Sequence, residues 1–477
     1  MNLENKISFV LDGKIQVIDF NYSEYTPTTT LLHYLRSLPT HKSVKEGCGE
    51  GDCGACTVVI GENNLGGIQY RAFDSCLIFL PSIYGKQVIT TENLGSADNL
   101  HPVQKALYEF DGSQCGFCTP GFVMSIYALY KQDNIPDKTE VTDAIAGNLC
   151  RCTGYRPIID AAEYVCNNKS EDIIDKSEKE TLALLNSVDK SETILISSSE
   201  QKYYLPFYKE DALKLRNENP QAVLVSGETD VALRVTKKNE LIPNIIDISQ
   251  VKDLKFEKET SDGFIFGANY SLEDIRQTCE GKLDALYDML CVFGSRQIRN
   301  RACLGGNLGS ASPIGDAIPV LMAYDAELTI ENINAKRTVK LRDFITGYRQ
   351  TKCNADELIT EIYIPFPTKD KIIKSYKISK RKDLDIATVS ACFSLILEAG
   401  KVKNIYAFYG GMAAWTKRAL STEKYLIGKE WNRNNVELAM KELANDFKPI
   451  SDARSGEKAR QIMAANLLLK FWSESGE

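Results

Sequence analysis

A glycine-rich loop with three closely spaced cysteines constrains this chain more than any other stretch. It covers residues 45–57, reads K-E-G-C-G-E-G-D-C-G-A-C-T, and places Cys48, Cys53 and Cys56 in a C-x4-C-x2-C array, with Cys76 further along. This is the plant-type spacing of a [2Fe–2S] site, in which three thiolates come from one loop and the fourth from elsewhere. The glycines (47, 49, 51 and 54) permit positive φ angles and let backbone N–H groups point at sulfur. A zinc site or scattered buried thiols are the alternatives, although zinc usually takes paired C-x2-C knuckles.

The residues around this loop have the pattern of a small β-sheet with one helix. Residues 6–20 form two alternating apolar runs around Asp12-Gly13, which is a strong signal for a β-hairpin. Thr28–Thr30 can cap a short helix that Pro39 ends, and Thr57–Ile60 has the composition of a strand. We therefore expect residues 1–90 to form a ferredoxin-like β-grasp domain, an arrangement similar to that of plant-type ferredoxins.

A second set of four cysteines lies where the apolar pattern changes to a helical period. Cys115 and Cys118 lie in Q-C-G-F-C-T-P-G, and Cys150 and Cys152 lie in N-L-C-R-C-T-G-Y. We expect Thr119 to be the N-cap of a helix, so that the first pair lies where free N–H groups and the helix dipole favour an anionic cluster. The spacing favours a second [2Fe–2S] cluster in a helical bundle over residues 91–166, with a four-cysteine zinc site as the alternative.

Composition predicts how the rest of the chain is divided. Residues 167–200 are rich in Ser, Lys, Glu and Asp and are expected to be a linker, within which E-T-L-A-L-L has the pattern of a short helix. Strand and helix patterns then alternate, which predicts an α+β domain over 201–368. A further α+β domain over 369–477 is expected to have strands near 372–378 and 387–397 and two closing helices near 435–446 and 456–473.

A glycine-rich stretch, Arg299–Asp316, packs Gly305, Gly306 and Gly309 among small hydroxyl residues. Such a loop lets the backbone approach a pyrophosphate and donate N–H bonds, but tight turns without a ligand have the same composition, so both interpretations stay open. It is neither a P-loop nor the G-x-G-x-x-G fingerprint. Six further cysteines have no ligand spacing and are interpreted as buried or incidental thiols. They are Cys166, Cys279, Cys291, Cys303, Cys353 and Cys392.

Length, charge and cysteine use limit the class of protein. The 477 residues are enough for about three domains. The net charge of −7 argues against nucleic acid or an anionic membrane as the main partner. No stretch approaches the ~18 apolar residues of a membrane span, and the N-terminal M-N-L-E-N-K does not have the pattern of a secretion signal. Fourteen cysteines in such a chain indicate metal ligands in a reducing compartment, which we expect to be the cytoplasm.

With both cysteine sets and the Gly-Gly-Asn loop, the chain resembles the molybdenum hydroxylase (xanthine oxidase/dehydrogenase) family, and in particular its bacterial iron–sulfur/FAD small subunits. The motifs E-G-C-G-E-G-D-C-G-A-C, Q-C-G-F-C-T-P-G and N-L-C-R-C-T-G-Y carry the resemblance, which extends over nearly the full length. It implies a multidomain α+β fold with four parts: a ferredoxin-like β-grasp domain, a helical [2Fe–2S] domain, an FAD-binding domain and a C-terminal flavoprotein domain. The implied cluster ligands are Cys48, Cys53, Cys56, Cys76, Cys115, Cys118, Cys150 and Cys152.

The resemblance also implies which residues bind FAD. The pyrophosphate would lie between two loops, and three further positions would contact the flavin. Ser226, Glu228 and Cys303 depart from residues common in the family, which leaves backbone contacts intact and puts their side-chain contacts in doubt. The implied contacts are Leu224, Val225, Ser226, Gly227, Glu228, Thr229, Asp230, Val231, Phe293, Cys303, Leu304, Gly305, Gly306, Asn307, Asp316 and Lys377.

A partner subunit follows from the same resemblance. A separate molybdopterin-binding large subunit is expected to hydroxylate hypoxanthine or xanthine, and Gln114 matches a residue that reaches its pterin; alternatively, Gln114 is a loop residue that bonds local backbone. Electrons would pass through the helical-domain cluster and then the ferredoxin-like cluster to FAD, and from there to NAD+. Two heterodimers forming a heterotetramer would suit the family. No catalytic residue for the purine is expected in this chain.

Three other functions are kept open by the residues alone. The first is the equivalent subunit of a hydroxylase that acts on an aldehyde, nicotinate or another heterocycle. The second is a non-catalytic ferredoxin-like carrier or scaffold. The third is a zinc-stabilised interaction protein. NAD+ and O2 users share these motifs, and the charged stretch Lys380–Asp385 is a candidate for the acceptor region or else a solvated turn.

Overall fold

A computed structural model describes residues 5–476 and divides the chain into two compact units. The first unit contains the residues up to Lys252 together with Ser295–Ala302, and the second contains Asp253–Gly294 and the residues from Cys303 onward. Residues 1–4, where no secretion signal is expected, lie outside the described part. Within the described part, no helix combines the length and apolarity that crossing a bilayer requires.

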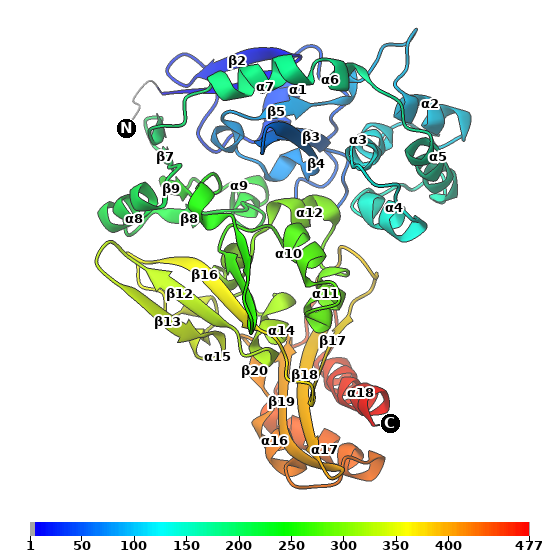
Figure 1. Cartoon of the computed structure of the whole chain (residues 1–477), viewed down its shortest axis with the longest axis vertical. Helices are drawn as coiled ribbons and strands as arrows, with labels where there is room; N and C mark the ends of the chain where they lie inside the picture. The colour runs from blue at the N-terminus through cyan, green and yellow to red at the C-terminus, as the bar shows by residue number, and fades with distance from the viewer. Residues whose placement is uncertain (1–4, 477) are drawn as a thin grey trace. The chain divides into compact units, whose positions relative to one another are not determined.

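Five strands and one helix form the N-terminal part of the first unit (Figure 1). They are β1 (Lys6–Leu11), β2 (Lys14–Asp19), α1 (Leu31–Ser37), β3 (Thr57–Asn64), β4 (Gly67–Asp74) and β5 (Gln87–Ile89). The strand order is β2-β1-β5-β3-β4. The predicted hairpin is confirmed, because Asp12 and Gly13 take φ values of 53° and 69° between the antiparallel β1 and β2. The predicted helix is also confirmed, and the hydroxyl of Thr30 accepts from the His33 N–H at its start.

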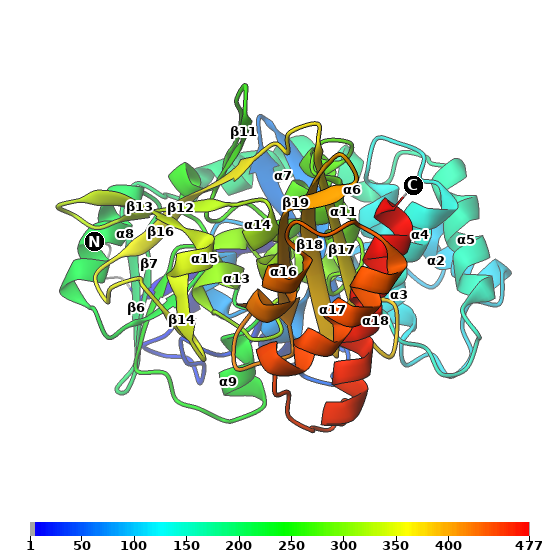
Figure 2. The ribbon, with the colours of Figure 1, turned by 90° about the horizontal axis from the view of Figure 1, so that it is seen from below.

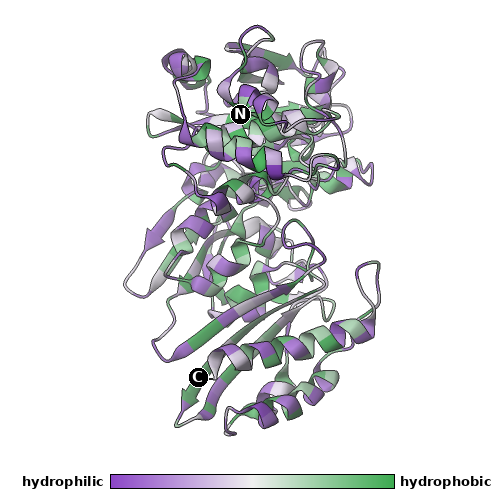
Figure 3. Cartoon of the chain, turned by 90° about the vertical axis from the view of Figure 1, so that its right-hand side faces the viewer, coloured by the Kyte–Doolittle hydropathy of each residue, from purple (hydrophilic) through white to green (hydrophobic). Residues whose placement is uncertain are grey.

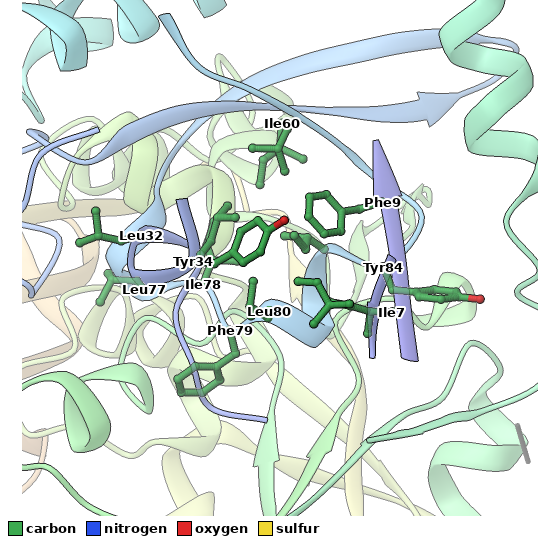
Figure 4. Close-up of a cluster of buried hydrophobic side chains, with 14 of the residues drawn as sticks. Ile7, Phe9, Leu32, Tyr34, Ile60, Leu77, Ile78, Phe79, Leu80 and Tyr84 are labelled. Carbon is green, nitrogen blue, oxygen red and sulfur yellow. The ribbon is translucent and has the colours of Figure 1, made fainter. Parts of the chain in front are cut away.

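Alternate residues of a strand point to opposite sides of the sheet, and this sheet has buried side chains on both sides. On one face Ile60 and Phe9 pack with the side chains of α1 and with the segment after Cys76 (Figure 4). On the other face Val59 and Tyr70 pack against the helices that follow in the chain. The sheet therefore contributes side chains to two apolar clusters, one in each cysteine-bearing part of the first unit.

Four helices form the part of the first unit that carries the second cysteine set. They are α2 (Pro102–Glu109), α3 (Thr119–Tyr130), α4 (Lys138–Ile145) and α5 (Arg156–Asn167). Phe122, Ile126 and Tyr127 on α3 are fully buried, which makes it the central helix of this part. The predicted cap of α3 was wrong by one residue, because Cys118 is the N-cap and Thr119 is the first helical residue. The Thr119 hydroxyl contacts the Ser113 hydroxyl at 2.7 Å and does not cap the helix.

The segment predicted as a linker is largely helical and packs against the first unit. It contains α6 (Ile173–Lys176) and α7 (Glu178–Ser187). α7 lies against β1, β3 and β4, and its Thr181 and Leu185 are buried. Composition alone suggested a solvated connection because most of its residues are polar. Two buried side chains one helical turn apart are enough to fix it to the sheet.

A buried ionic cluster ties α6 to the helical part. Asp172 caps α6, and its carboxylate contacts the His101 ring at 3.2 Å and the Lys131 ammonium at 3.5 Å. The side chains of Asp172 and His101 are only 1% and 2% exposed. Burial raises the pKa of Asp172, but the His101 ring, the Asp175 N–H and Lys131 together lower it to about 2.

We expect Asp172→Asn to lower the free energy of unfolding by about 2–3 kcal/mol at pH 7, because a pKa of about 2 against 3.8 unfolded stabilises the native state by that amount. A carboxylate with a lowered pKa stabilises the fold above its unfolded pKa, so the difference from wild type should vanish as the pH falls from 3.8 to about 2. Urea titration followed by circular dichroism measures both effects. Asp133→Asn, at an exposed position near α3, is the control and should change stability by less than ~0.5 kcal/mol.

The first unit ends with a mixed sheet of order β6-β7-β9-β8. Its elements are β6 (Ile194–Ser197), β7 (Lys202–Leu205), α8 (Lys209–Glu218), β8 (Val223–Val225), α9 (Ala232–Thr236), β9 (Asn244–Asp247) and α12 (Arg296–Arg301). Strands and helices alternate here, as the sequence pattern beyond residue 201 predicts. Buried residues of β6, β7 and β9 continue the same apolar cluster as β1 and α1.

Two larger sheets and one short hairpin form the second unit, with helices beside them (Figure 2). One sheet has the order β10-β11-β16-β12-β13, the other β17-β18-β19-β20, and the hairpin pairs β14 with β15. The strands are β10 (Glu257–Glu259), β11 (Gly263–Gly267), β12 (Glu327–Glu331), β13 (Lys336–Lys340), β14 (Ile345–Gly347), β15 (Gln350–Thr351), β16 (Leu358–Pro365), β17 (Lys371–Ile378), β18 (Val389–Glu398), β19 (Lys401–Gly410) and β20 (Lys417–Arg418).

The helices of the second unit cover these sheets. They are α10 (Leu272–Cys279), α11 (Asp284–Leu290), α13 (Leu304–Gly309), α14 (Ala317–Ala323), α15 (Leu341–Phe344), α16 (Leu420–Leu426), α17 (Arg433–Asp446) and α18 (Glu457–Ser475). The two predicted closing helices correspond to α17 and α18. Hydrophobic and hydrophilic residues alternate along α18 up to the C-terminus (Figure 3), and its Leu468 and Phe471 are buried in the cluster shared with β18 and β19.

Candidate iron–sulfur and flavin sites

The first cysteine set meets as two pairs of thiols. Cys48 hydrogen bonds to Cys53, and Cys56 to Cys76, which arrives on the short turn after β4. The main-chain N–H groups of Glu50 and Asp52 donate to Cys48 Sγ at 3.4 and 3.3 Å. The Cys53 thiol and these N–H groups lower the pKa of Cys48 to about 5. The loop therefore favours the thiolate form at Cys48, whereas the hydrogen bond to Cys48 and burial raise the pKa of Cys53.

The glycines of this loop take the conformations that the sequence predicts at three of four positions. Gly49, Gly51 and Gly54 have φ values of 66°, 77° and 64°. Gly47 is needed for space instead, since a Cβ there would lie 2.7 Å from Cys53 Sγ. A Cβ at Gly51 would lie 2.5 Å from Leu77, so the loop folds tightly over the residue that follows Cys76.

The second cysteine set is also arranged in two pairs. Cys115 hydrogen bonds to Cys152 and Cys118 to Cys150. Burial raises the pKa of Cys150, but the Thr153 hydroxyl, 3.2 Å from its sulfur, and nearby N–H groups lower it overall. Cys115 and Cys152 are exposed at the surface of the first unit, whereas Cys118 and Cys150 are half-buried.

Both arrangements fit a cluster with two iron atoms. In residues 5–476 no three or more His, Cys, Asp or Glu side chains are grouped as a single metal ion requires. Two pairs of thiolates are what a [2Fe–2S] cluster needs, because each iron takes two protein sulfurs beside the bridging sulfides. The N–H and hydroxyl donors to sulfur are of the kind that set cluster potentials.

Sequence reasoning missed two residues next to these cysteines. The Asp74 carboxyl is fully buried, and its Oδ1 lies 3.8 Å from Cys56 Sγ. Asn148, two residues before Cys150, contacts the first cysteine loop through Gly54. Asp74 was detectable as an acidic residue two positions before the fourth cysteine, directly after Ala72 and Phe73. Nothing in the sequence pattern indicated the contact of Asn148.

We expect Gly54→Ala to lower the iron content of the purified chain. A Cβ at Gly54 would lie 2.4 Å from the Gly147 carbonyl oxygen and 2.4 Å from Asn148 Nδ2, and its φ of 64° is strained for alanine. Gly116→Ala is the matched control, since Gly116 has a φ of 81° in the other cysteine loop but nothing within 4 Å of its Cβ position. The control should show only a loss of about 1 kcal/mol in stability. Equal iron loss in both variants would contradict a role for the close approach.

The segment Leu224–Val231 lies in the first unit, where it begins within β8 and ends at the N-cap of α9. Gly227 has no room for a side chain, because a Cβ would lie 2.4 Å from the Arg301 carbonyl oxygen. Glu228, with a φ of 61°, is fully buried and turns into the protein. This arrangement leaves the backbone of the segment, rather than the Glu228 side chain, for contacts with a ligand.

The Glu228 carboxylate is the centre of a buried hydrogen-bond network. It accepts from Arg301 Nη2 at 2.6 Å, from the Phe79 N–H at 3.2 Å and from the Tyr203 hydroxyl at 3.0 Å. The same hydroxyl lies 2.7 Å from Asp247 Oδ2, and its single proton is donated to one of these two carboxyl groups at a time. Phe79 follows Cys76 by three residues, so this network ties the predicted flavin-binding segment to the part of the chain that carries the fourth cysteine of the first set.

In the second unit the predicted glycine-rich loop is partly helical. Residues 304–309 form α13, and Cys303 is its N-cap, with a thiol that accepts from the Gly306 N–H at 3.3 Å. None of Gly305, Gly306 and Gly309 has a positive φ, so the backbone conformation of this stretch does not itself require glycine. Gly305 is required for packing, because a Cβ would lie 2.7 Å from that of Ala268.

Three of the predicted FAD contacts come together in the second unit. Lys377 Nζ pairs with Asp316 Oδ2 at 2.9 Å and donates to the carbonyl of Val292, next to Phe293, at 2.7 Å. Within residues 5–476 the buried Oδ1 atoms of Asp316 and Asn307 have no hydrogen-bond partner. Burial raises the pKa of Asp316, and Lys377 opposes that effect. These orphaned polar atoms fit residues that contact a bound cofactor.

Comparisons with known proteins agree with this reading of the sites. Residues 14–76 match the family model of the 2Fe-2S iron-sulfur cluster binding domain, and residues 90–163 that of a [2Fe-2S] binding domain. Residues 197–367 match the FAD binding domain in molybdopterin dehydrogenase, and residues 374–475 the CO dehydrogenase flavoprotein C-terminal domain. Two [2Fe–2S]-binding domains with an FAD-binding domain define an iron–sulfur flavoprotein.

Curated relatives place the chain in a family. It is 34% identical to xanthine dehydrogenase from Drosophila subobscura, 33% to that from Calliphora vicina and 30% to xanthine dehydrogenase/oxidase from Gallus gallus, over 97%, 97% and 98% of its length. The chain spans 39%, 38% and 40% of these relatives. It belongs to the molybdenum hydroxylase family, and its xanthine dehydrogenase relatives are oxidoreductases.

Solved structures share part of the fold. A carbon monoxide dehydrogenase chain from Hydrogenophaga pseudoflava has a TM-score of 0.54 at 22% identity, over 56% of this chain and 94% of its own. A chain of quinoline 2-oxidoreductase from Pseudomonas putida 86 has a TM-score of 0.53 at 19% identity, over 57% and 95%. At these identities the likeness concerns the fold alone.

Proposed function

We propose that this chain is the iron–sulfur/FAD electron-transfer subunit of a xanthine dehydrogenase. The observation that carries the proposal is the pair of two-plus-two thiol sets in one unit, each in a [2Fe–2S]-binding domain. Similarity to xanthine dehydrogenases over 97–98% of the chain supports a purine-oxidising enzyme. Hypoxanthine and xanthine would be oxidised in a partner subunit, with NAD+ as the final acceptor.

The chain's own residues hold the cofactors in this proposal. When bound, the clusters carry single electrons and the flavin carries two, which suits delivery of a hydride to nicotinamide. The eight cysteines supply the thiolates, and the N–H groups of Glu50 and Asp52 bond to Cys48. The segments 224–231 and 303–307 would bind FAD through their backbones, since Glu228 is already occupied by Arg301.

The exposed half of the second cysteine set is the proposed docking surface for the partner. Cys115 and Cys152 lie at the surface, Gln114 is exposed beside them, and 49% of the Phe117 surface is accessible. We propose that the partner is a molybdopterin-binding large subunit whose pterin Gln114 reaches, and that two heterodimers assemble into a heterotetramer.

The substrate is the part of the proposal that this chain determines least. The partner would select it, and the same iron–sulfur flavoprotein would serve a hydroxylase for an aldehyde, nicotinate or another heterocycle. The likeness in fold to a chain of quinoline 2-oxidoreductase illustrates that this architecture is not restricted to purines.

Spectroscopy of the isolated chain tests the cofactors, and a coupled assay tests the substrate. We expect visible absorption from both iron–sulfur clusters and flavin, with iron and sulfide in equal amounts. With the partner co-purified, xanthine should drive NADH formation. A colourless chain made anaerobically with sufficient iron would exclude the electron-transfer function. A pigmented complex that oxidises another heterocycle but neither xanthine nor hypoxanthine would exclude only the purine assignment.

A further inference from the structure

Asn148 lies between the two cysteine loops, and every hydrogen-bonding group of its side chain is used. Its Nδ2 donates to the Gly54 carbonyl at 3.0 Å and to Thr57 Oγ1 at 3.2 Å. Its Oδ1 accepts from Ser125 Oγ at 2.6 Å and from Gln297 Nε2 at 3.0 Å. Only 2% of the residue is exposed. A fully satisfied buried amide of this kind fixes the elements that it joins.

Next to Asn148, one main-chain hydrogen bond connects the two sets of cysteines. The Leu149 N–H donates to the carbonyl oxygen of Cys53 at 3.0 Å. Cys53 belongs to the first set, and Leu149 directly precedes Cys150 of the second set. A route from one set of sulfurs to the other therefore runs along covalent bonds and crosses a single hydrogen bond, with no gap through space.

The backbone segments around this hydrogen bond pack so closely that two of their positions have no room for a side chain. A Cβ at Gly54 would lie 2.4 Å from Asn148 Nδ2, and a Cβ at Gly121, three residues after Cys118, would lie 2.2 Å from the Gly54 carbonyl oxygen. Two glycines from different parts of the first unit thus permit the contact. The Gln297 amide reaches Asn148 from α12 and closes the network from the other side.

We propose that Asn148 is a positioning residue that holds the two cysteine sets in register, so that the Leu149–Cys53 hydrogen bond couples them electronically. This inference rests on the proposed electron-transfer function. With both clusters bound, an electron passing between the two sets would oxidise the donor cluster and reduce the acceptor cluster, with no change in covalent bonds and no proton transfer. Asn148 itself carries no electron and acts through the geometry of the Leu149 and Cys53 peptides.

The test uses the purified full-length chain with its own cofactors. Flavin is reduced by a laser flash, and freeze-quench electron paramagnetic resonance follows the signal of each cluster, together with the magnetic coupling between the two reduced clusters. In Asn148→Ala we expect both signals to persist, the coupling to weaken, and the rate at which the helical-domain cluster is reduced to fall about tenfold.

Asn148→Asp keeps the side-chain size but loses the donor to Gly54 and should behave in the same way. Ser125→Ala removes one bond to Asn148 and leaves its contact with Gly54, so the rate should stay within about twofold of wild type.

Each outcome bears on the inference. Unchanged coupling and rate in variants that retain both clusters would overturn it. Loss of iron from both Asn148 variants, with full iron in Ser125→Ala, would also overturn it. Asn148 would then be needed to keep the cysteines in place for iron binding, rather than to fix the position of one cysteine set relative to the other. A wild-type chain without iron would instead contradict the proposed function.

Discussion

Replacing Cys150 with serine is expected to remove half of the iron from the chain and to abolish purine-driven reduction of its flavin. Cys150 is half-buried, pairs with Cys118 and receives a hydrogen bond from the Thr153 hydroxyl. Serine is a much poorer iron ligand than a thiolate, because its hydroxyl is far less acidic, so the helical-domain cluster should be lost while the ferredoxin-like one is retained. In the complex with the molybdenum partner, stopped-flow absorbance should then show no flavin bleaching by xanthine, whereas NADH should still reduce dyes through the flavin.

The matched control for this prediction is Cys166→Ala, a buried cysteine on α5 of the same domain with no ligand spacing. It should retain all of its iron and the full rate of flavin reduction by xanthine. Unimpaired purine-driven reduction in the Cys150→Ser complex would count against the proposed order of the two clusters. Simultaneous loss of NADH-to-dye activity would show that the variant had disturbed the flavin domain as well.

Arg301→Met is expected to lower the free energy of unfolding by about 3–5 kcal/mol at pH 8, because it leaves the Glu228 carboxylate buried without its cation. The two side chains are 9% and 0% exposed and lie 2.6 Å apart. The double variant Glu228→Gln/Arg301→Met removes both charges and should recover most of the loss. Urea titrations of the single and double variants measure the effect, and equal stability of Arg301→Met and wild type would contradict it.

The pH dependence of the same site has a defined sign. Burial raises the pKa of Glu228 from 4.5 to about 7, an effect that Arg301 opposes and Asp247 reinforces. The folded state therefore holds the proton more tightly than the unfolded state. The contribution of Glu228 to stability is complete below pH 4.5 and is lost as the pH rises to about 7. Relative to Glu228→Gln, wild type should lose stability across this range and remain level above it.

Local signals in the sequence were enough to predict most elements near the first site. The hairpin at Asp12-Gly13, the helix capped by Thr30 and the positive φ angles of Gly49 and Gly51 each depend on a few neighbouring residues. The cysteine spacing likewise identified which thiols meet, because three of the first four lie on one loop. Such features follow from residue chemistry within a short window.

Features that depend on distant residues were not predictable from one sequence. The Glu228 carboxylate pairs with Arg301, and the Asn148 amide bonds to Gly54 and Gln297. In each of these pairs the two residues are far apart in the sequence. The polar segment after residue 167 looked like a linker because two buried side chains on α7 weigh little in its composition. Helix α13 was not predicted because three of its six residues are glycines, which have a low helix propensity. In the structure, close packing of Gly305 against Ala268 outweighs this low propensity.

The short helix α12 has a consequence for how the protein is made. Although its neighbours in sequence on both sides belong to the second unit, Ser295–Ala302 is part of the first, where Arg299 binds Asp143 at 2.6 Å and Gln297 binds Asn148. The N-terminal half therefore cannot complete its native packing during translation until residue 302 has left the ribosome. A gene fragment cut after residue 200 or 252 would yield an unfinished domain rather than an independent ferredoxin.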